Sequence, residues 1–231
     1  ARQHPSQLSE KTLIRILVGT EAPTYQDASS WRKSLKEAQE KDALFEIETA
    51  QSLRQEVESR YETSSQLDFE RVQLRAQVSH DRVASLLAEG QKLKASEIAK
   101  ESVRRFRDIE LDRTQHPPGV VDFYKKHRAR LSSQKQGEIQ VSGTMAGILY
   151  ADGLRLGPIV DQSRYRLPQG HYRLWIRDGK GPGLARAIVV GQELQTIAFD
   201  EVLEAALRVM PHHHLACAEA CETILGKFAQ K

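Results

Sequence analysis

The spacing of apolar residues changes near residue 138. Up to that point, large apolar side chains recur every three or four residues between charged ones, which is the pattern of amphipathic helices. Beyond it, short runs alternate apolar and polar residues and end at Gly or Asp-Gly, as in "HYRLWIRDG". The pattern predicts helices followed by a small all-β unit, and therefore an α+β fold class.

These patterns divide the chain into four segments. They are an N-terminal strand and loop over residues 1–24, a helical-hairpin domain over 25–133, a small β-sandwich over 138–200 and a C-terminal helical segment over 201–231. The N-terminal strand, "TLIRILV", needs the edge of a sheet, because backbone N–H and C=O groups need hydrogen-bond partners. The pattern leaves open which edge that is, and whether the native chain continues past residue 231.

Four helices are expected in the helical-hairpin domain. The first covers about residues 30–61 without a Gly or Pro, and the second has apolar residues over 69–87 and stops at Gly90. The third covers about residues 96–111, and a fourth follows Pro118. Short polar turns between such helices favour antiparallel hairpins.

The helices resemble a degenerate tetratricopeptide array over residues 38–131. The resemblance lies in the helix that contains Ala50, the helix end "LLAEG", the following helix with Ala99, and the finish "LD…HPP". No clean 34-residue repeat accompanies it. Arrays of this type present a concave groove to partner segments, so the resemblance implies protein binding.

The β unit resembles the PEGA family of small β-sandwich modules over residues 138–200. The matching stretches are "DGLRLG" (152–157), "LPQGHYRLWI" (167–176) and "VVGQE" (189–193), although Gln169 and His171 depart from the family's letters. The resemblance implies a β-sandwich in a bacterial surface or envelope setting, without catalytic activity. We therefore expect a periplasmic or envelope-associated protein, with the cytoplasm as the alternative.

Charge and hydropathy narrow the choice of partner. The 34 Lys and Arg against 31 Asp and Glu leave a net charge of +3, and this small excess is dispersed rather than gathered on one face. The longest apolar runs, such as "LIRILV", are too short to cross a bilayer. We expect a protein partner, no nucleic acid and no transmembrane segment in this chain.

The sequence lacks the common motifs of active sites. It contains no nucleophile elbow, no HExxH and no paired-carboxylate motif. The Gly-rich stretch "DGKGPG" lacks the Lys-Ser/Thr of a phosphate loop and is typical of a hairpin turn. We therefore expect a protein that is not an enzyme and needs no cofactor.

One strand carries a candidate partner surface. Alternation places Tyr172, Leu174 and Ile176 on a core face and puts a tryptophan between two arginines on the other face. Trp and Arg are enriched at the centres of protein interfaces. The candidate partner-binding residues are Arg164, Arg166, Arg173, Trp175 and Arg177. The alternatives are arginines stacked over an exposed Trp175, or a Trp175 covered by the neighbouring helices.

A second candidate site lies in "HHHLACAEAC". Cys217 and Cys221 share a helix face, and His213 and His214 lie one turn upstream, so thiolate and imidazole ligands for zinc are close together. The usual Cys-x-x-Cys spacing is absent, and cysteines among alanines also fit a packed helix. A disulfide within one helix would be strained.

We therefore expect a non-enzymatic bacterial cell-envelope binding or scaffold protein that acts through a helical groove and a β-module. The alternative is a metal-linked sensor, or part of a larger enzyme completed beyond the C-terminus, with zinc as the cofactor.

Overall fold

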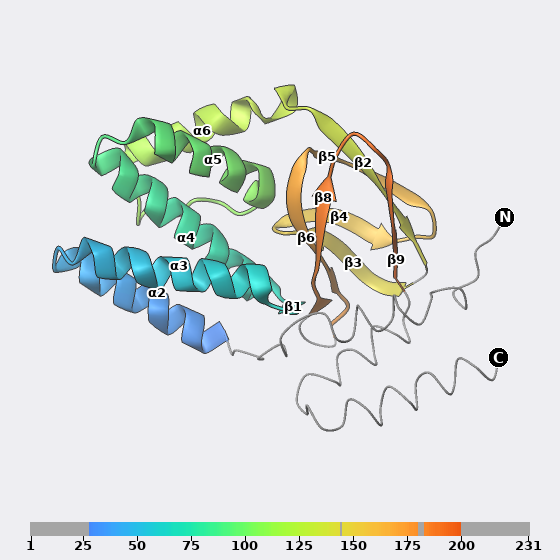
Figure 1. Cartoon of the computed structure of the whole chain (residues 1–231), viewed down its shortest axis with the longest axis horizontal. Coiled ribbons are helices and arrows are strands. Elements are labelled where there is room, and N and C mark those ends of the chain that lie inside the picture. The colour runs from blue at the N-terminus through green and yellow to red at the C-terminus, as the bar shows by residue number, and fades with distance from the viewer. Residues whose placement is uncertain (1–27, 144, 180–182, 200–231) are drawn as a thin grey trace.

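The computed structural model describes residues 28–143, 145–179 and 183–199. Helices fill one side of the molecule and strands the other (Figure 1), so the fold class is α+β, as predicted. The N-terminal strand "TLIRILV" and the C-terminal helical segment fall outside the described residues. Among the described helices, none has the length and apolar content needed to cross a bilayer.

The helical part consists of two antiparallel hairpins and a final helix. The described helices are α2 (Ala28–Ala43), α3 (Ile47–Thr63), α4 (Phe69–Ala88), α5 (Lys92–Phe106) and α6 (Pro118–Ala129), followed by a short 3-10 helix, η2 (Leu131–Ser133). Helix α2 packs against α3, and α4 packs against α5. As predicted, a helix stops at Gly90, which has a φ of 75° that glycine adopts without steric strain.

The single helix expected over residues 30–61 is two helices. The chain turns at Leu44–Glu46, where Phe45 has a φ of 60°. A bulky side chain rarely adopts this left-handed conformation, and neither Gly nor Pro marks the turn in the sequence. The prediction was wrong because the turn carries none of the residues, Gly or Pro, by which a sequence marks a helix end.

Seven of the described strands form two packed sheets. One has the order β5-β2-β9 and the other β4-β3-β6-β8. Their bounds are β2 (Gln136–Ser142), β3 (Met145–Ala151), β4 (Leu154–Ile159), β5 (Ser163–Pro168), β6 (Gly170–Arg177), β8 (Arg186–Val190) and β9 (Gln195–Ala198). Between the sheets lies a core that includes Ile139, Leu149 and, as predicted, Tyr172, Leu174 and Ile176.

The helical part contributes a strand to the β part. Between α3 and α4, β1 (Gln66–Leu67) pairs antiparallel with β7 (Gly183–Leu184). A Cβ on Gly183 would lie 2.0 Å from the Ile176 carbonyl oxygen, so only glycine lets β7 pass this close to β6. Two residues are too few to produce an alternating pattern, so β1 could not be predicted from the sequence.

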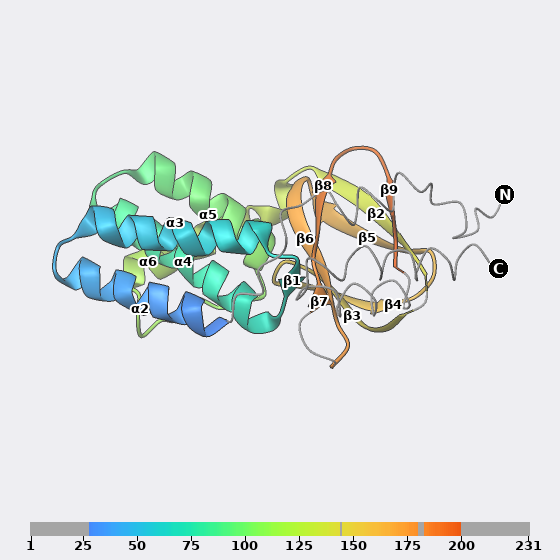
Figure 2. The same ribbon diagram turned by 60° about the horizontal axis from the view of Figure 1, so that its bottom comes forward.

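A second core joins the helices to the four-stranded sheet. Trp31 and Tyr61 from the helices belong to the same buried cluster as Tyr150 and Trp175 from the sheet. The Tyr150 and Trp175 rings stack at 4.6 Å, and Trp175 is 1% exposed. The four-stranded sheet is therefore the middle of three layers, between the helices and the other sheet (Figure 2).

We predict that Trp175→Ala lowers the free energy of unfolding by about 3–5 kcal/mol, because it empties a packed site between two layers. Chemical denaturation measures this loss. Arg177→Ala is the matched control, since Arg177 ends the same strand and is exposed. Its effect should stay within about 0.5 kcal/mol. Equal effects of the two substitutions would show that Trp175 does not hold the layers together.

Candidate functional site

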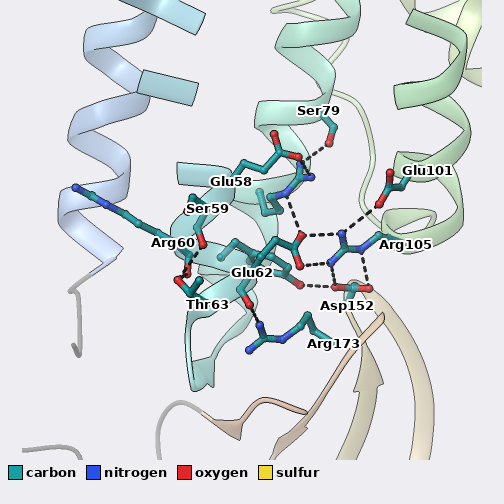
Figure 3. A network of polar contacts seen from close by, with 12 residues as sticks. Glu58, Ser59, Arg60, Glu62, Thr63, Ser79, Glu101, Arg105, Asp152 and Arg173 are labelled. Carbon is teal, nitrogen blue, oxygen red and sulfur yellow. Dashed lines mark hydrogen bonds and ion pairs between the residues drawn. The ribbon is translucent and has the colours of Figure 1, made fainter. Parts of the chain in front are cut away.

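A buried carboxylate lies at the junction of the helices and the sheet. Asp152, in the two-residue turn between β3 and β4, has 0% exposure and a φ of 50°. The Tyr61 hydroxyl donates to Asp152 Oδ1 at 2.7 Å. Arg105 donates from Nη2 to Oδ1 at 2.8 Å and from Nε to Oδ2 at 3.0 Å (Figure 3). Both carboxylate oxygens therefore have partners on the helices.

The backbone groups of this turn also form hydrogen bonds, as the Asp152 side chain does. The amide of Asp152 donates to the Arg173 carbonyl at 2.7 Å, and the amide of Gly153 donates to the Arg105 carbonyl at 3.0 Å. The Trp175 indole donates from Nε1 to the Asp152 carbonyl at 2.9 Å. Asp tolerates the left-handed conformation better than most residues, which suits it to this turn. The turn is therefore fixed from three sides.

Arg105 links Asp152 to two further carboxylates. Its Nη1 donates to Glu62 Oε1 at 2.7 Å and to Glu101 Oε1 at 3.4 Å. Burial alone would lower the pKa of Arg105, but the charge and hydrogen bonds of Asp152, together with the hydrogen bond to Glu62, outweigh burial and raise it. Burial alone would raise the pKa of Glu62, but the hydrogen bond and charge of Arg105, together with the charges of Arg75 and Arg173, outweigh burial and lower it. Both groups therefore stay charged at neutral pH.

The phenol of Tyr61 keeps its proton in this site. Burial and the negative charge of Asp152 raise the pKa of Tyr61 well above its ordinary value. A protonated hydroxyl is the form that can donate a hydrogen bond to the carboxylate. Tyr61 therefore supplies a neutral donor beside the charged one from Arg105.

Arg173 joins strand β6 to the end of α3. Its guanidinium donates to the backbone carbonyls of Glu62 and Ser64. Carbonyls at a helix C-terminus carry partial negative charge and favour a cation. Burial lowers the pKa of Arg173, although the side chain remains a cation at any physiological pH. We name Tyr61, Glu62, Arg105, Asp152 and Arg173 together the junction network.

The junction network consists of contacts within the protein, between its helices and its four-stranded sheet. Each charged group in it meets an opposite charge or an oriented backbone carbonyl, and the central carboxylate has no exposed surface. Removing one partner of such a buried pair leaves an uncompensated charge in the interior. The junction network therefore has a structural role, which is to hold the helices on the sheet.

A second group of titratable side chains lies among the helices. The His80 ring lies 5.0 Å from the Tyr124 ring and 6.0 Å from the His116 ring, and His116 Nε2 lies 3.7 Å from Asp81 Oδ1. Burial, with the nearby His116 and Arg128, lowers the pKa of His80 to about 3. Burial raises the pKa of Asp81 to about 6, although Arg54 Nε lies 3.9 Å away. Across the described residues, no three His, Cys, Asp or Glu side chains are grouped so that they could hold a metal ion.

The structure does not assemble the predicted partner surface. Trp175 and Arg173 are 1% and 6% exposed, so the predicted open face of β6 is wrong and the alternative, cover by the neighbouring helices, holds. Arg177 is exposed at the end of the same strand. Arg164 and Arg166 lie on β5, in the other sheet, at 3.9 Å and 3.8 Å from Glu138. The predicted zinc site falls outside the described residues. It comprises His213, His214, Cys217 and Cys221.

Asp152, Arg105 and Tyr61 could not be predicted as a unit from the sequence. The Asp-Gly pair marks the turn, but a turn residue is expected at the surface. Arg105 stands in the run "RRFR", which by itself is typical of a solvated helix face. Only Tyr61 is a largely apolar residue, and it lies at the end of a predicted helix.

Comparisons with protein-family models, with curated proteins and with solved structures find no match for this chain. The tetratricopeptide and PEGA resemblances therefore stay predictions.

We predict that Asp152→Ala lowers the free energy of unfolding by about 3–5 kcal/mol, because Arg105 loses its buried counterion. Glu138→Ala is the control, since its carboxylate forms ion pairs with two exposed arginines, Arg164 and Arg166, at 3.8 Å or more. The control should change the free energy of unfolding by less than about 1 kcal/mol. Denaturant titration of both variants at neutral pH distinguishes a structural connection from a surface charge pair.

We predict that His80 weakens the fold in acid. Its folded pKa of about 3 lies below the ordinary value of 6.5, so its stabilising contribution is complete above pH 6.5 and is lost as the pH falls toward 3. Asp81 has the opposite effect. Its pKa is raised from 3.8 to about 6 in the folded state, so its protonation stabilises the fold as the pH falls through this range. His80→Phe should therefore remove about 1–2 kcal/mol of the loss of stability between pH 7 and pH 5.

The measurement for His80 is the free energy of unfolding of both proteins at each pH. His171→Phe is the matched control, since it removes an exposed histidine. An unchanged pH dependence in His80→Phe would contradict the assignment of the acid sensitivity to His80.

Proposed function

We propose that this protein is a non-enzymatic binding or scaffold protein of the bacterial cell envelope, which takes its protein partner at the outer end of its helices. The envelope setting rests on the resemblance of residues 138–200 to PEGA modules. The junction network supports the scaffold role, because a bidentate buried ion pair and two backbone-bonded arginine nitrogens hold the helices in one orientation on the sheet.

An apolar turn marks the outer end of the helices. Leu44, Phe45 and Ile47, in and beside the turn between α2 and α3, are 64%, 88% and 37% exposed, and we name them the apolar tip. Leu93, beside the turn between α4 and α5, is 85% exposed. Figures 1 and 2 place both turns at the end of the helical part that lies away from the sheets. Aromatic and large aliphatic side chains of this kind anchor protein interfaces.

The main support for this proposal is the backbone conformation of Phe45. A left-handed φ costs a non-glycine residue about 1–2 kcal/mol, and here it holds a ring that is almost fully in solvent. The amide of Glu46 donates to the Lys41 carbonyl at 2.9 Å, and Lys41 Nζ contacts Glu46 Oε2 at 2.9 Å, so the turn is braced. An ordered, strained turn that displays an aromatic ring suits insertion into an apolar pocket of a partner.

We predict that Phe45→Gly weakens partner binding without loss of stability. Glycine adopts the left-handed conformation freely, so the variant should be as stable as the wild type or up to about 1 kcal/mol more stable. The experiment is crosslinking capture from native cells, followed by titration of the purified, identified partner. The dissociation constant should rise at least tenfold, which is about 1.4 kcal/mol.

Leu194→Ser is the matched control for the apolar tip. Leu194 is 43% exposed, lies between β8 and β9, and should bind the partner like the wild type. Equal affinity of Phe45→Gly and wild type for the captured partner would refute the proposed role of the tip.

A further inference from the structure

Positive charge is concentrated in one segment between the helical part and the β part. Residues 123–137 cover the second half of α6, η2 and the first residues of β2. They contain five of the 34 Lys and Arg of the chain and none of its 31 Asp and Glu. The five are Lys125, Lys126, Arg128, Arg130 and Lys135, and all are exposed. The prediction that the positive charge is dispersed is therefore wrong for this segment.

The apolar side of α6 explains why these cations point outward. Val120, Tyr124 and His127 are buried and lie three or four residues apart, and Leu131 continues this row after the helix. Helix α6 packs against α4 and α5, and its apolar residues share a core with those of α5. The remaining positions of α6, which include the cations, face solvent.

Few ion pairs offset these cations. Within residues 28–143, 145–179 and 183–199, the one ion pair of the five joins Lys125 Nζ to Asp122 Oδ1 at 3.1 Å. Glu138, the next carboxylate along the chain, contacts the two exposed arginines of β5. Glu101 on α5 contacts arginines of its own helix. The segment therefore keeps most of its positive charge for a partner.

Helix α5 adds Lys100 to the same cluster. Burial lowers the pKa of the His127 ring, and three nearby positive charges lower it further. These charges belong to Arg130, Lys100 and Lys126. Cations that lie this close together repel one another, and an anionic partner would relieve the repulsion. The basic ridge, as we name the cluster, consists of Lys100, Lys125, Lys126, Arg128, Arg130 and Lys135.

Stabilisation of a helix end accounts for only part of the basic ridge. Lys126 and Arg128 lie in the last turn of α6, where cations favour the partial negative charge of the terminal carbonyls. Arg130 and Lys135 lie beyond the helix, and Lys100 lies on a different one. The effect of the helix dipole ends within the last turn, so the ridge extends further than this role requires.

The form of the basic ridge favours a surface of lipid headgroups. By helical spacing, Lys125 and Arg128 lie on one side of α6, and Lys126 and Arg130 lie on the other. They project from a convex helix, so they can contact many headgroup phosphates of a flat bilayer at once. Proteins that bind single-stranded nucleic acid combine cations with exposed aromatic rings, whereas neither Phe nor Tyr of α6 is exposed.

The attachment would be electrostatic. Within residues 118–143, no large apolar side chain is exposed, so the described part of this segment offers nothing to insert between lipid chains. Attraction between exposed charges is screened by salt. Binding through the basic ridge should therefore be reversible and should weaken as the ionic strength rises.

We propose that the basic ridge attaches the protein to the surface of an anionic bilayer. The envelope setting proposed above supplies that bilayer, so the inference rests on the proposed function. In Figure 1, α6 follows the upper side of the helical part, and the turn between α2 and α3 lies at its left end. The protein can therefore hold its partner at the apolar tip while the ridge lies on the membrane.

The test is co-sedimentation of the purified full chain with vesicles, in the absence of a protein partner. At low salt, the wild type should bind vesicles of equal parts phosphatidylcholine and phosphatidylglycerol at least tenfold more tightly than vesicles of phosphatidylcholine alone. High salt should remove this difference. Each cation near an anionic bilayer strengthens attachment about fivefold. The variant Lys126→Gln/Arg128→Gln/Arg130→Gln should therefore bind the anionic vesicles about 100-fold more weakly.

The matched control is Lys33→Gln/Lys36→Gln/Arg177→Gln. It removes three exposed cations that lie outside the ridge, on α2 and β6. Because charges further away than a Debye length are screened, its binding to the anionic vesicles should fall by less than about threefold. Both triple variants should keep the melting temperature of the wild type, since the substituted side chains are exposed.

Other outcomes would overturn the proposal. Equal binding of the wild type to both kinds of vesicle, or equal losses in the two triple variants, would show that the ridge does not recognise lipid charge. Tighter binding to a duplex DNA oligonucleotide or to polyglutamate would identify a nucleic acid or an acidic protein as the partner. Loss of vesicle binding in Phe45→Gly alone would move the membrane contact to the apolar tip. The vesicles contain no protein, so failure here leaves partner capture at the tip as a separate test.

Discussion

The ion pair between Asp152 and Arg105 sets the relation between the two halves of this protein. Neither group is stable alone in the interior, since each would face the full loss of hydration without compensation. Together they are bidentate, and Tyr61 and Glu62 satisfy the remaining donor and acceptor positions. Folding therefore has one arrangement in which these charges are matched, and that arrangement specifies how the helices sit on the sheet.

Apolar packing and chain pairing act at the same junction. Trp175 and Tyr150 share a buried cluster with Trp31 and Tyr61, and β1 brings the backbone between α3 and α4 into contact with β7. Contacts that share partners in this way do not contribute independently, so the loss of one weakens the others. The helical and β parts consequently share a core.

The sequence predicted the fold class and the positions of most helices and strands, because the change from a helical to an alternating period is a local property. The inward face of β6 was also predictable, as Tyr172, Leu174 and Ile176 confirm. The burial of Trp175 was not, since alternation identifies two faces of a strand but not what covers the second one. The turn at Phe45 was missed for a related reason, because it uses neither Gly nor Pro.

The connection of Arg173 to the end of α3 has a consequence for the order of folding. Arg173 lies 111 residues after Glu62, the helix residue whose carbonyl it binds. During synthesis the helical hairpins leave the ribosome long before β6 does, with the end of α3 and the Trp31 cluster still lacking their cover. Long-range contacts of this kind are closed late, after the loop-closure entropy has been overcome. The nascent helical part must therefore persist with an exposed apolar face until the β part has been made.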